Sequence, residues 1–229
     1  MIEPEKIVAH RGAWKDFNLP QNSIQAFLKA QELPIGGIEF DLQYTKDGKI
    51  IVHHDDEYRG RMIYQKHYLQ LKGLQVLTKE PVLSFKRIMK YWKGEKSLWI
   101  ELKPSGLNDK QKEKFVKKVI QTIGDRLTNI YFISFDLFIL KELQKYTVLP
   151  CLYLGSDATL DTLLEEGING LDVEYIDFLN TPELLIEAKK HQLITNAWTV
   201  NDLEIAQKLS AMGIDFITTD KLLLLIGKE

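Results

Sequence analysis

The sequence has very little cysteine, no long apolar run and almost no excess charge. Cys151 is the only cysteine among 229 residues, so no disulfide can form within the chain, and we interpret Cys151 as a small buried hydrophobe. No apolar run reaches the ~20 residues that a membrane-spanning helix needs. The first residues, MIEPEKIVAH, lack the basic, apolar and small-residue succession of a secretory signal. These absences predict a cytoplasmic protein without a membrane span.

The charge balance excludes partners that are recognised by a global electric field. The formal net charge is -2, from 30 Lys and Arg against 32 Asp and Glu, which would gather neither nucleic acid nor an anionic membrane surface. The Lys-rich run 110–118 is interrupted at helical spacing by Glu113 and Phe115, so we interpret it as a solvated helix face. We therefore expect no nucleic-acid partner, and any anion must be recognised locally.

Short apolar or β-branched runs alternate with segments of helical periodicity along the whole chain. The content of 45% hydrophobic and 27% charged residues is typical of a globular protein, and the alternation is typical of βα units on a parallel sheet. Eight strands close such a sheet into a barrel, so the sequence predicts an α/β fold, a (β/α)8 TIM barrel that occupies 1–229 as one domain. The predicted strands are Lys6–His10, Gly37–Gln43, Ser97–Lys103, Asn129–Ser134, Val148–Leu154, Gly170–Glu174, Leu193–Val200 and Ile214–Thr218.

One connection interrupts this alternation after the second strand. Asp47-Gly48 followed by the apolar run Ile50–Val52 predicts an antiparallel hairpin, because Asp-Gly accommodates the positive φ angles of a tight turn. A short insertion at about 55–81 then precedes the amphipathic segment Ser84–Trp92. We expect the insertion to form a small cap on the surface.

Three acidic residues share the parity of the barrel interior. Glu39 and Asp41 alternate with apolar residues in the second strand, and Glu101 does so in the third. Close, inward-pointing carboxylates resist ionisation unless a cation lies between them. Hard oxygen ligands suit Mg²⁺ or Ca²⁺. The sequence thus predicts a divalent-cation site, and the alternative is that the acids form ion pairs with Lys103 or Arg11.

Two histidines are predicted to flank these acids. If the hairpin has a two-residue loop, Asp41 pairs with His54, which then overhangs the cation, while His53 points away as a packing or surface residue; a bulge would exchange the two. His10 ends the first strand and is followed by Arg11, which suggests a proton carrier beside an anion clamp.

The sequence contains an ordered set of motifs that resembles the glycerophosphodiester phosphodiesterase family. They span nearly the whole chain: His10-Arg11-Gly12, Pro20-Gln21-Asn22-Ser23, Ile38-Glu39-Phe40-Asp41, Thr45-Lys46-Asp47-Gly48, His54-Asp55, Ile100-Glu101-Leu102-Lys103, Asn196-Ala197-Trp198-Thr199-Val200-Asn201, Gly213-Ile214-Asp215 and Thr219-Asp220.

The resemblance implies a role for each matching residue. Glu39, Asp41 and Glu101 would bind the metal, and His10 and His54 would be the general acid and base. Arg11 and Lys103 would bind phosphate oxygens, Trp198 would pack against the glycerol moiety, and Ser134 and Tyr153 are weaker candidates. This chain departs from the family pattern at Gln21 and Ser23, where the family commonly has Glu and Thr, and in a short segment after His54.

These residues predict metal-dependent hydrolysis of a glycerophosphodiester to sn-glycerol 3-phosphate and an alcohol. Water could attack phosphorus directly, or the glycerol 2-hydroxyl could attack first to give a cyclic phosphate; both routes need the same groups. The alternatives are a lysophospholipase-D-like enzyme acting on lipid substrates, and a non-catalytic barrel that binds a phosphorylated ligand. A metal-free phosphosugar enzyme would leave the acidic cluster unexplained.

Overall fold

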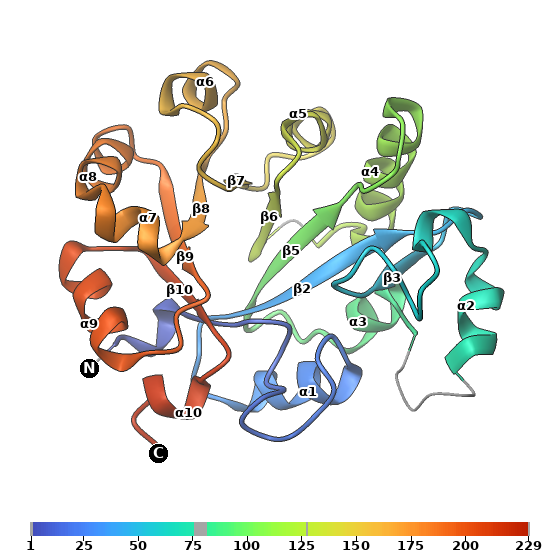
Figure 1. Cartoon of the computed structure of the whole chain (residues 1–229), viewed down its shortest axis with the longest axis horizontal. Coiled ribbons are helices and arrows are strands. Elements are labelled where there is room, and N and C mark those ends of the chain that lie inside the picture. Colours follow the sequence, from blue (N-terminus) through green and yellow to red (C-terminus); the bar gives the residue numbers. More distant parts are fainter. Residues whose placement is uncertain (1, 76–81, 127, 229) are drawn as a thin grey trace.

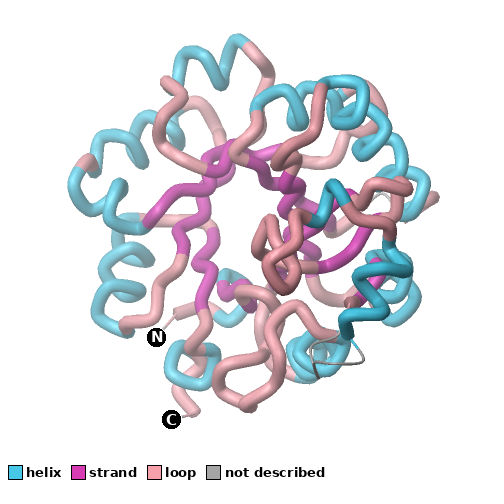
Figure 2. Tube along the Cα trace, turned by 45° about the vertical axis from the view of Figure 1, so that its right-hand side comes forward, coloured by secondary structure: helices cyan, strands magenta, loops and turns pink. Residues whose placement is uncertain are grey.

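The chain folds into a closed barrel of eight parallel strands surrounded by helices, as predicted (Figures 1 and 2). The computed structural model describes residues 2–75, 82–126 and 128–228. The barrel order is β1-β2-β5-β6-β7-β8-β9-β10, and β10 pairs with β1 to close the ring. The strands are β1 (Ile7–Ala9), β2 (Gly37–Tyr44), β5 (Ser97–Lys103), β6 (Ile130–Ser134), β7 (Cys151–Leu154), β8 (Gly170–Glu174), β9 (Ile194–Trp198) and β10 (Phe216–Thr219).

Helices follow the strands and cover the outside of the barrel. Ser23 and Asp202 cap the N-termini of α1 and α9 by accepting hydrogen bonds from the backbone N–H of Ala26 and Ile205. No helix in the described part of the chain is both long and apolar enough to span a bilayer. The helices are α1 (Ile24–Glu32), α2 (Tyr68–Gln75), α3 (Phe85–Tyr91), α4 (Asp109–Ile123), α5 (Leu137–Gln144), α6 (Leu160–Glu165), α7 (Tyr175–Asn180), α8 (Pro182–Lys190), α9 (Leu203–Met212) and α10 (Leu222–Leu225), with short 3-10 helices η1 (Pro4–Lys6) and η2 (Ile63–Gln65).

Alternation along the strands produces two separate hydrophobic layers. The larger layer lies between strands and helices and includes Ile38, Phe40 and Ile100. The smaller layer fills the barrel interior, where Trp99 stacks on Tyr131 with ring centroids 4.4 Å apart. The interior is packed at this level, and the polar side chains of the candidate site lie beyond it, toward the carboxyl ends of the strands.

The predicted hairpin forms, but its register differs from the prediction. β3 (Ile50–Val52) pairs with β2 so that Leu42 lies opposite Val52, and the pair is extended by β4 (Leu83–Ser84). The turn has one more residue than predicted, because the backbone N–H of Thr45 bonds to the carbonyl of Lys49. His53, rather than His54, is therefore the residue opposite Asp41, and the predicted Asp41–His54 pairing is wrong.

The insertion after β3 contains η2 and α2 and has a small core of its own. Ile51, Tyr58, Ile63 and Leu71 are buried together in this core. His53 belongs to this part of the chain, since its ring contacts that of Tyr58 at 5.5 Å. Residues 76–81 of the predicted cap lie outside the described residues.

Candidate active site

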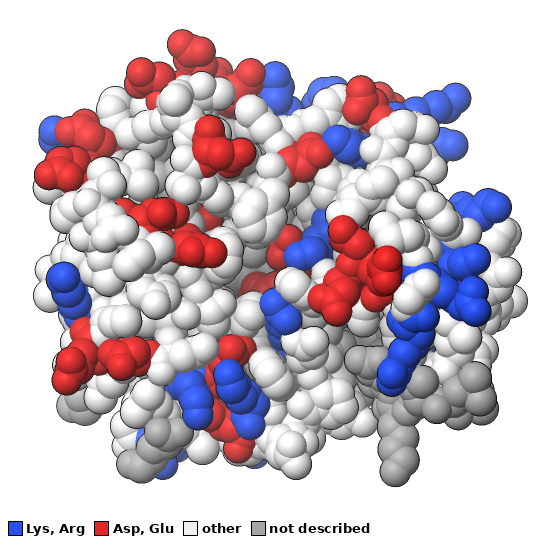
Figure 3. Space-filling model, in the orientation of Figure 1, with Lys and Arg blue, Asp and Glu red and all other residues white. Residues whose placement is uncertain are grey.

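The candidate site is a pocket of about 190 Å³ at the carboxyl ends of the barrel strands. In Figure 3, acidic and basic side chains come together around the hollow in the middle of the face shown. Seven of the eight predicted site residues line the pocket, and the eighth, Asp41, belongs to a buried acidic cluster with two of them, Glu39 and Glu101. The pocket is lined by His10, Arg11, Glu39, His54, Glu101, Lys103, Ile133, Phe135, Leu154, Asp172, Trp198, Thr199 and Thr218.

The three predicted acids converge on one wall of the pocket. Glu39, Asp41 and Glu101 each have a carboxylate oxygen within 4.8 Å of those of the other two, and all three are buried. The strand register explains this, because Asp41 on β2 lies opposite Glu101 on β5 and Glu39 precedes Asp41 by one pleat repeat.

Burial and mutual repulsion make this cluster electrostatically strained. Burial raises the pKa of both Glu39 and Glu101 well above the ordinary value, and the Asp41 charge raises each further. Burial opposes ionisation of Asp41 too, but the Lys103 ammonium and neighbouring groups hold its pKa well below the usual range. Three carboxyl groups thus share a site in which only part of their charge is balanced.

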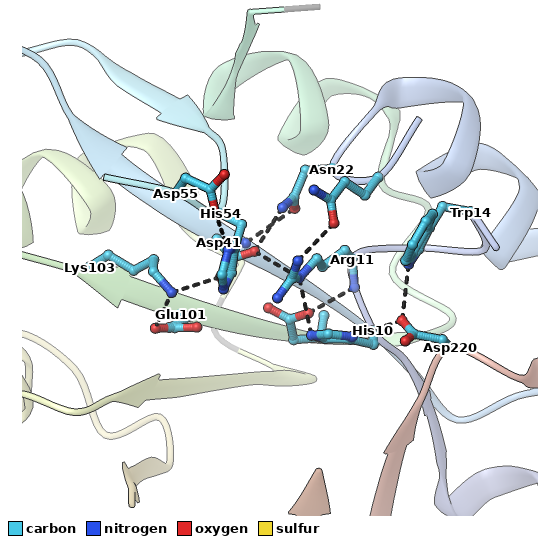
Figure 4. Close-up of polar contacts among 12 residues, drawn as sticks. His10, Arg11, Trp14, Asn22, Asp41, His54, Asp55, Glu101, Lys103 and Asp220 are labelled. Atoms are coloured by element: carbon cyan, nitrogen blue, oxygen red, sulfur yellow. Dashed lines mark hydrogen bonds and ion pairs between the residues drawn. The ribbon is translucent and has the colours of Figure 1, made fainter. Parts of the chain in front are cut away.

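Lys103 and Arg11 lie against the cluster from opposite sides (Figure 4). The Lys103 Nζ is 3.0 Å from Glu101 Oε1 and 3.4 Å from Asp41 Oδ1. The Arg11 backbone N–H donates to Glu39 at 2.8 Å, and its Nε is 3.8 Å from Asp41. The ion pairs considered as the alternative to a cation site are therefore present, but they leave the pKa of two acids raised.

The neutral Gln21 orients Arg11. The Nη1 of Arg11 donates to Gln21 Oε1 at 2.7 Å, and its Nε donates to His10 Nε2 at 3.1 Å. Gln21 thus holds the guanidinium without adding a negative charge, and Asn22 donates to Asp41 at 2.7 Å from the same loop. Apart from its ion pair with Asp41, the Arg11 guanidinium is thus held by neutral groups and can attract an anion in the pocket.

Each of the two histidines in the pocket has a carboxylate on its Nδ1. His10 Nδ1 is 2.8 Å from Asp220 Oδ1, which also accepts from Trp14 Nε1 at 3.0 Å (Figure 4). Since His10 Nε2 accepts from Arg11, its Nδ1 carries the proton and donates to Asp220.

His54 reaches the pocket although its predicted pairing is wrong. β3 ends at Val52, and the chain leaves the ladder so that His54 turns to the pocket while His53 packs on Tyr58. His54 Nδ1 is 2.7 Å from Asp55 Oδ1. Burial lowers the pKa of His54, which favours a neutral imidazole at neutral pH.

The rest of the pocket is lined mainly by apolar side chains. Ile133 lies beside Glu101 on the neighbouring strand, whereas Leu154 and Trp198 lie farther round the barrel. Phe135 packs edge-to-face on Trp198 with ring centroids 6.0 Å apart. The two weaker candidates are engaged elsewhere: the Ser134 hydroxyl donates to the Leu102 carbonyl at 2.7 Å, and that of Tyr153 donates to Asp157 at 2.7 Å.

The chemistry of the acidic cluster fits a hard divalent cation. Its side chains offer only carboxylate oxygens, no His nitrogen or Cys sulfur is among them, and Mg²⁺ and Ca²⁺ prefer oxygen ligands. A cation would also replace the repulsion that raises the pKa of Glu39 and Glu101 with attraction.

Fold and site together define a (β/α)8 barrel protein whose polar groups converge at the carboxyl ends of its strands. Residues 10–224 match the Glycerophosphoryl diester phosphodiesterase family. The chain therefore belongs to this family, which confirms the resemblance and the expected enzyme class.

Proteins similar to this chain are known in sequence and in structure. A glycerophosphodiester phosphodiesterase of Caldanaerobacter subterraneus subsp. tengcongensis is 28% identical over 231 residues, covering 93% of each chain. The crystal structure of a glycerophosphodiester phosphodiesterase from Parabacteroides distasonis has a TM-score of 0.90 at 30% identity and covers 97% of this chain and 95% of its own. An Oleispira antarctica phosphodiesterase, solved with the product sn-glycerol-3-phosphate, shares the fold, with a TM-score of 0.82, 20% identity and coverage of 97% and 96%.

Proposed function

We propose that this chain, as a single cytoplasmic barrel domain with a small cap, hydrolyses small glycerophosphodiesters to sn-glycerol 3-phosphate and an alcohol. The observation that carries the proposal is the pocket itself, where three buried carboxylates, two cationic side chains and two histidines meet. Glu39, Asp41 and Glu101 would bind Mg²⁺ or Ca²⁺. The bound cation would polarise a phosphoryl oxygen and offset its charge.

Arg11 and Lys103 would bind the nonbridging phosphate oxygens. A phosphodiester resists attack because its negative charge repels nucleophiles, so cationic side chains in a pocket that partly excludes water lower the barrier. Both side chains are less than one-fifth exposed, at 18% and 16%. A guanidinium also matches two phosphate oxygens at once.

His54 and His10 would transfer the protons. The lowered pKa of His54 favours it as the base that accepts a proton from the nucleophile. His10 donates from Nδ1 to Asp220, so a proton held on its Nε2 would leave an imidazolium that the Asp220 carboxylate stabilises. Because the same Nε2 accepts a hydrogen bond from Arg11 Nε in the structure, the guanidinium would have to turn to the phosphate on substrate binding, and His10 would then protonate the departing alcohol from Nε2. The same assignment serves attack by water and attack by the glycerol 2-hydroxyl.

The decisive experiment measures glycerol phosphate released from glycerophosphocholine and glycerophosphoethanolamine by the full chain, with Mg²⁺, with Ca²⁺ and after chelation. We expect release with a cation and none without it. His10→Ala and His54→Ala should each lower turnover by about 10²–10⁴-fold. Asp215→Asn is a matched control, because Asp215 accepts hydrogen bonds from Thr195 outside the pocket.

Two alternative functions make different predictions in the same assay. No release with any metal, combined with tight binding of glycerol phosphate, would indicate a non-catalytic barrel. Faster turnover of a lysophospholipid than of its deacylated counterpart would indicate a lysophospholipase-D-like enzyme. The small volume of the pocket, about 190 Å³, favours the deacylated substrate.

A further inference from the structure

A buried carboxyl group, Asp172, lies on the pocket wall that faces the acidic cluster. In the ring of eight strands, β8 lies four strands from β2 in either direction, so Asp172 and Asp41 are on opposite sides of the barrel. Asp172 lines the same pocket as Glu39 and Lys103. A phosphate held by the β1, β2 and β5 side would therefore direct one of its ester groups toward Asp172.

One oxygen of Asp172 accepts no hydrogen bond from any residue that the structure describes. Asp172 is 1% exposed, and Asn196 Nδ2 donates to its Oδ1 at 2.7 Å. In the described part of the chain no other side chain or N–H bonds to this carboxyl, and no buried side-chain oxygen or nitrogen lacks a partner. The Oδ2 atom must therefore be open to the pocket.

Asn196 holds this carboxyl beside a second polar group. Its Nδ2 also donates to Thr218 Oγ1 at 2.8 Å, and its Oδ1 accepts from the Thr218 hydroxyl at 3.2 Å, so Thr218 offers a ligand an acceptor and no donor. Thr218 lines the pocket while Asn196 does not. The Trp198 indole donates to the Asp172 carbonyl at 3.2 Å, which fixes the strand at this point. A carboxyl and a hydroxyl are thus presented together.

The surroundings of this pair suit a small polyol. Leu154 lies opposite Asp172 on β7 and lines the pocket, where it can contact CH₂ groups, while the two polar side chains can bond to hydroxyls. Burial raises the pKa of Asp172 to about 7, so near neutral pH the group is present both as an acceptor and as a donor, like a hydroxyl. A buried polar group is costly without a partner, and a ligand hydroxyl would supply one.

We propose that Asp172, together with Thr218, binds the hydroxyl groups of the glycerol moiety and selects substrates whose phosphate is esterified to a polyol. This inference rests on the proposed function of the pocket. A cationic alcohol group is a poorer occupant of this wall, because a quaternary ammonium has no hydrogen to donate to Oδ2 and a buried ion pair carries a large desolvation cost.

The test compares two substrates that differ only in these hydroxyls, glycerophosphocholine and propylphosphocholine. The protein should prefer the first, and Asp172→Ala should reduce that preference by roughly 10- to 100-fold, mostly by slowing glycerophosphocholine. Thr218→Val should shift the preference in the same direction by less, and Asp215→Asn should leave it unchanged. If Asp172→Ala does not fold, Asp172→Asn preserves the volume and should give the smaller change.

A binding measurement separates this inference from the proposed function. Calorimetry with sn-glycerol 3-phosphate and with inorganic phosphate should show that Asp172→Ala weakens only the first. Equal weakening of both ligands, or an unchanged substrate preference, would overturn the role of Asp172. Asp172→Ala could instead slow cleavage of glycerophosphocholine but not of glycerophosphoglycerol. That result would place the leaving alcohol, rather than the glycerol moiety, beside Asp172 and would also overturn the inference. A wild-type protein that binds glycerol phosphate but cleaves neither substrate would refute the proposed function alone.

Discussion

Replacing Asp220 by Asn tests whether the residue that follows the last barrel strand orients His10. The Asp220 carboxylate accepts hydrogen bonds from His10 Nδ1 at 2.8 Å, Trp14 Nε1 at 3.0 Å and Asn201 Nδ2 at 3.2 Å. Burial opposes ionisation of Asp220, but these donors lower its pKa from 3.8 to about 2.

The pKa of Asp220 sets the size and the sign of the expected change in stability. A pKa lowered from 3.8 to about 2 corresponds to ~2.4 kcal/mol, at about 1.4 kcal/mol per pH unit. Asn keeps part of the hydrogen bonding, so we expect Asp220→Asn to lower the free energy of unfolding by about 1–2 kcal/mol at pH 7. A lowered acid pKa stabilises above pH 3.8 and loses its effect as pH falls toward 2.

Urea denaturation and steady-state kinetics check both parts of this prediction. The stability difference between wild type and Asp220→Asn should be full at pH 7 and at pH 5 and smaller at pH 3. The kcat should fall by about 10²-fold or more with a smaller change in KM, because the Asn amide favours the wrong tautomer of His10. Asp16→Asn is the control, since Asp16 bonds to the Leu223 N–H and not to a histidine. Wild-type turnover in Asp220→Asn would refute the reasoning.

Three further predictions address the cation, the loop after β1 and the phosphate clamp. The pKa values of Glu39 and Glu101 are raised in the folded chain, so above pH 4.5 the folded, cation-free protein binds more protons than the unfolded chain. Its free energy of unfolding should therefore fall as pH rises from 5 to 8. Mg²⁺ or Ca²⁺ at 100 times its Kd should restore about 2.7 kcal/mol, measured by urea denaturation with and without chelator, and no effect of either ion would contradict the site. Gly12→Ala should lower the free energy of unfolding, measured by thermal denaturation, by about 2 kcal/mol more than Gly94→Ala does. Both glycines have a positive φ (80° and 85°), but of the two only Gly12 would bring a Cβ against helix backbone, at 2.9 Å from Ala26. Lys103→Met should raise the KM for glycerophosphocholine by about 10-fold or more, and an unchanged KM would remove Lys103 from phosphate binding.

The barrel and the acidic cluster could be predicted because both follow from strand periodicity. Glu39, Asp41 and Glu101 occupy interior positions, and the pairing of two adjacent parallel strands brings them together independently of the loop conformations. Strand ends are less exact: the strand predicted from Val148 begins at Cys151, since Pro150 cannot donate to the sheet and Val148 is 95% exposed.

The partners of the histidines could not be predicted, because they depend on chain paths that no local pattern encodes. The Thr45 hydroxyl bonds to Asp47 and to Lys49, which lengthens the hairpin turn and shifts its register. Asp55 reaches His54 only because β3 ends at Val52. Asp220 belongs to the Thr219-Asp220 motif of the family resemblance, but its contact with His10 requires closure of the whole ring.

That closure also decides when the protein can become active during its synthesis. The first strand is made well before the last, yet β1 needs β10 as a neighbour and His10 needs a group made 210 residues later. At ~5–20 residues per second this interval is roughly 10–40 s. A nascent chain lacking β10 would carry both imidazoles and all three acids without an assembled centre, so translation itself would delay phosphodiester cleavage until β10 and Asp220 have been made.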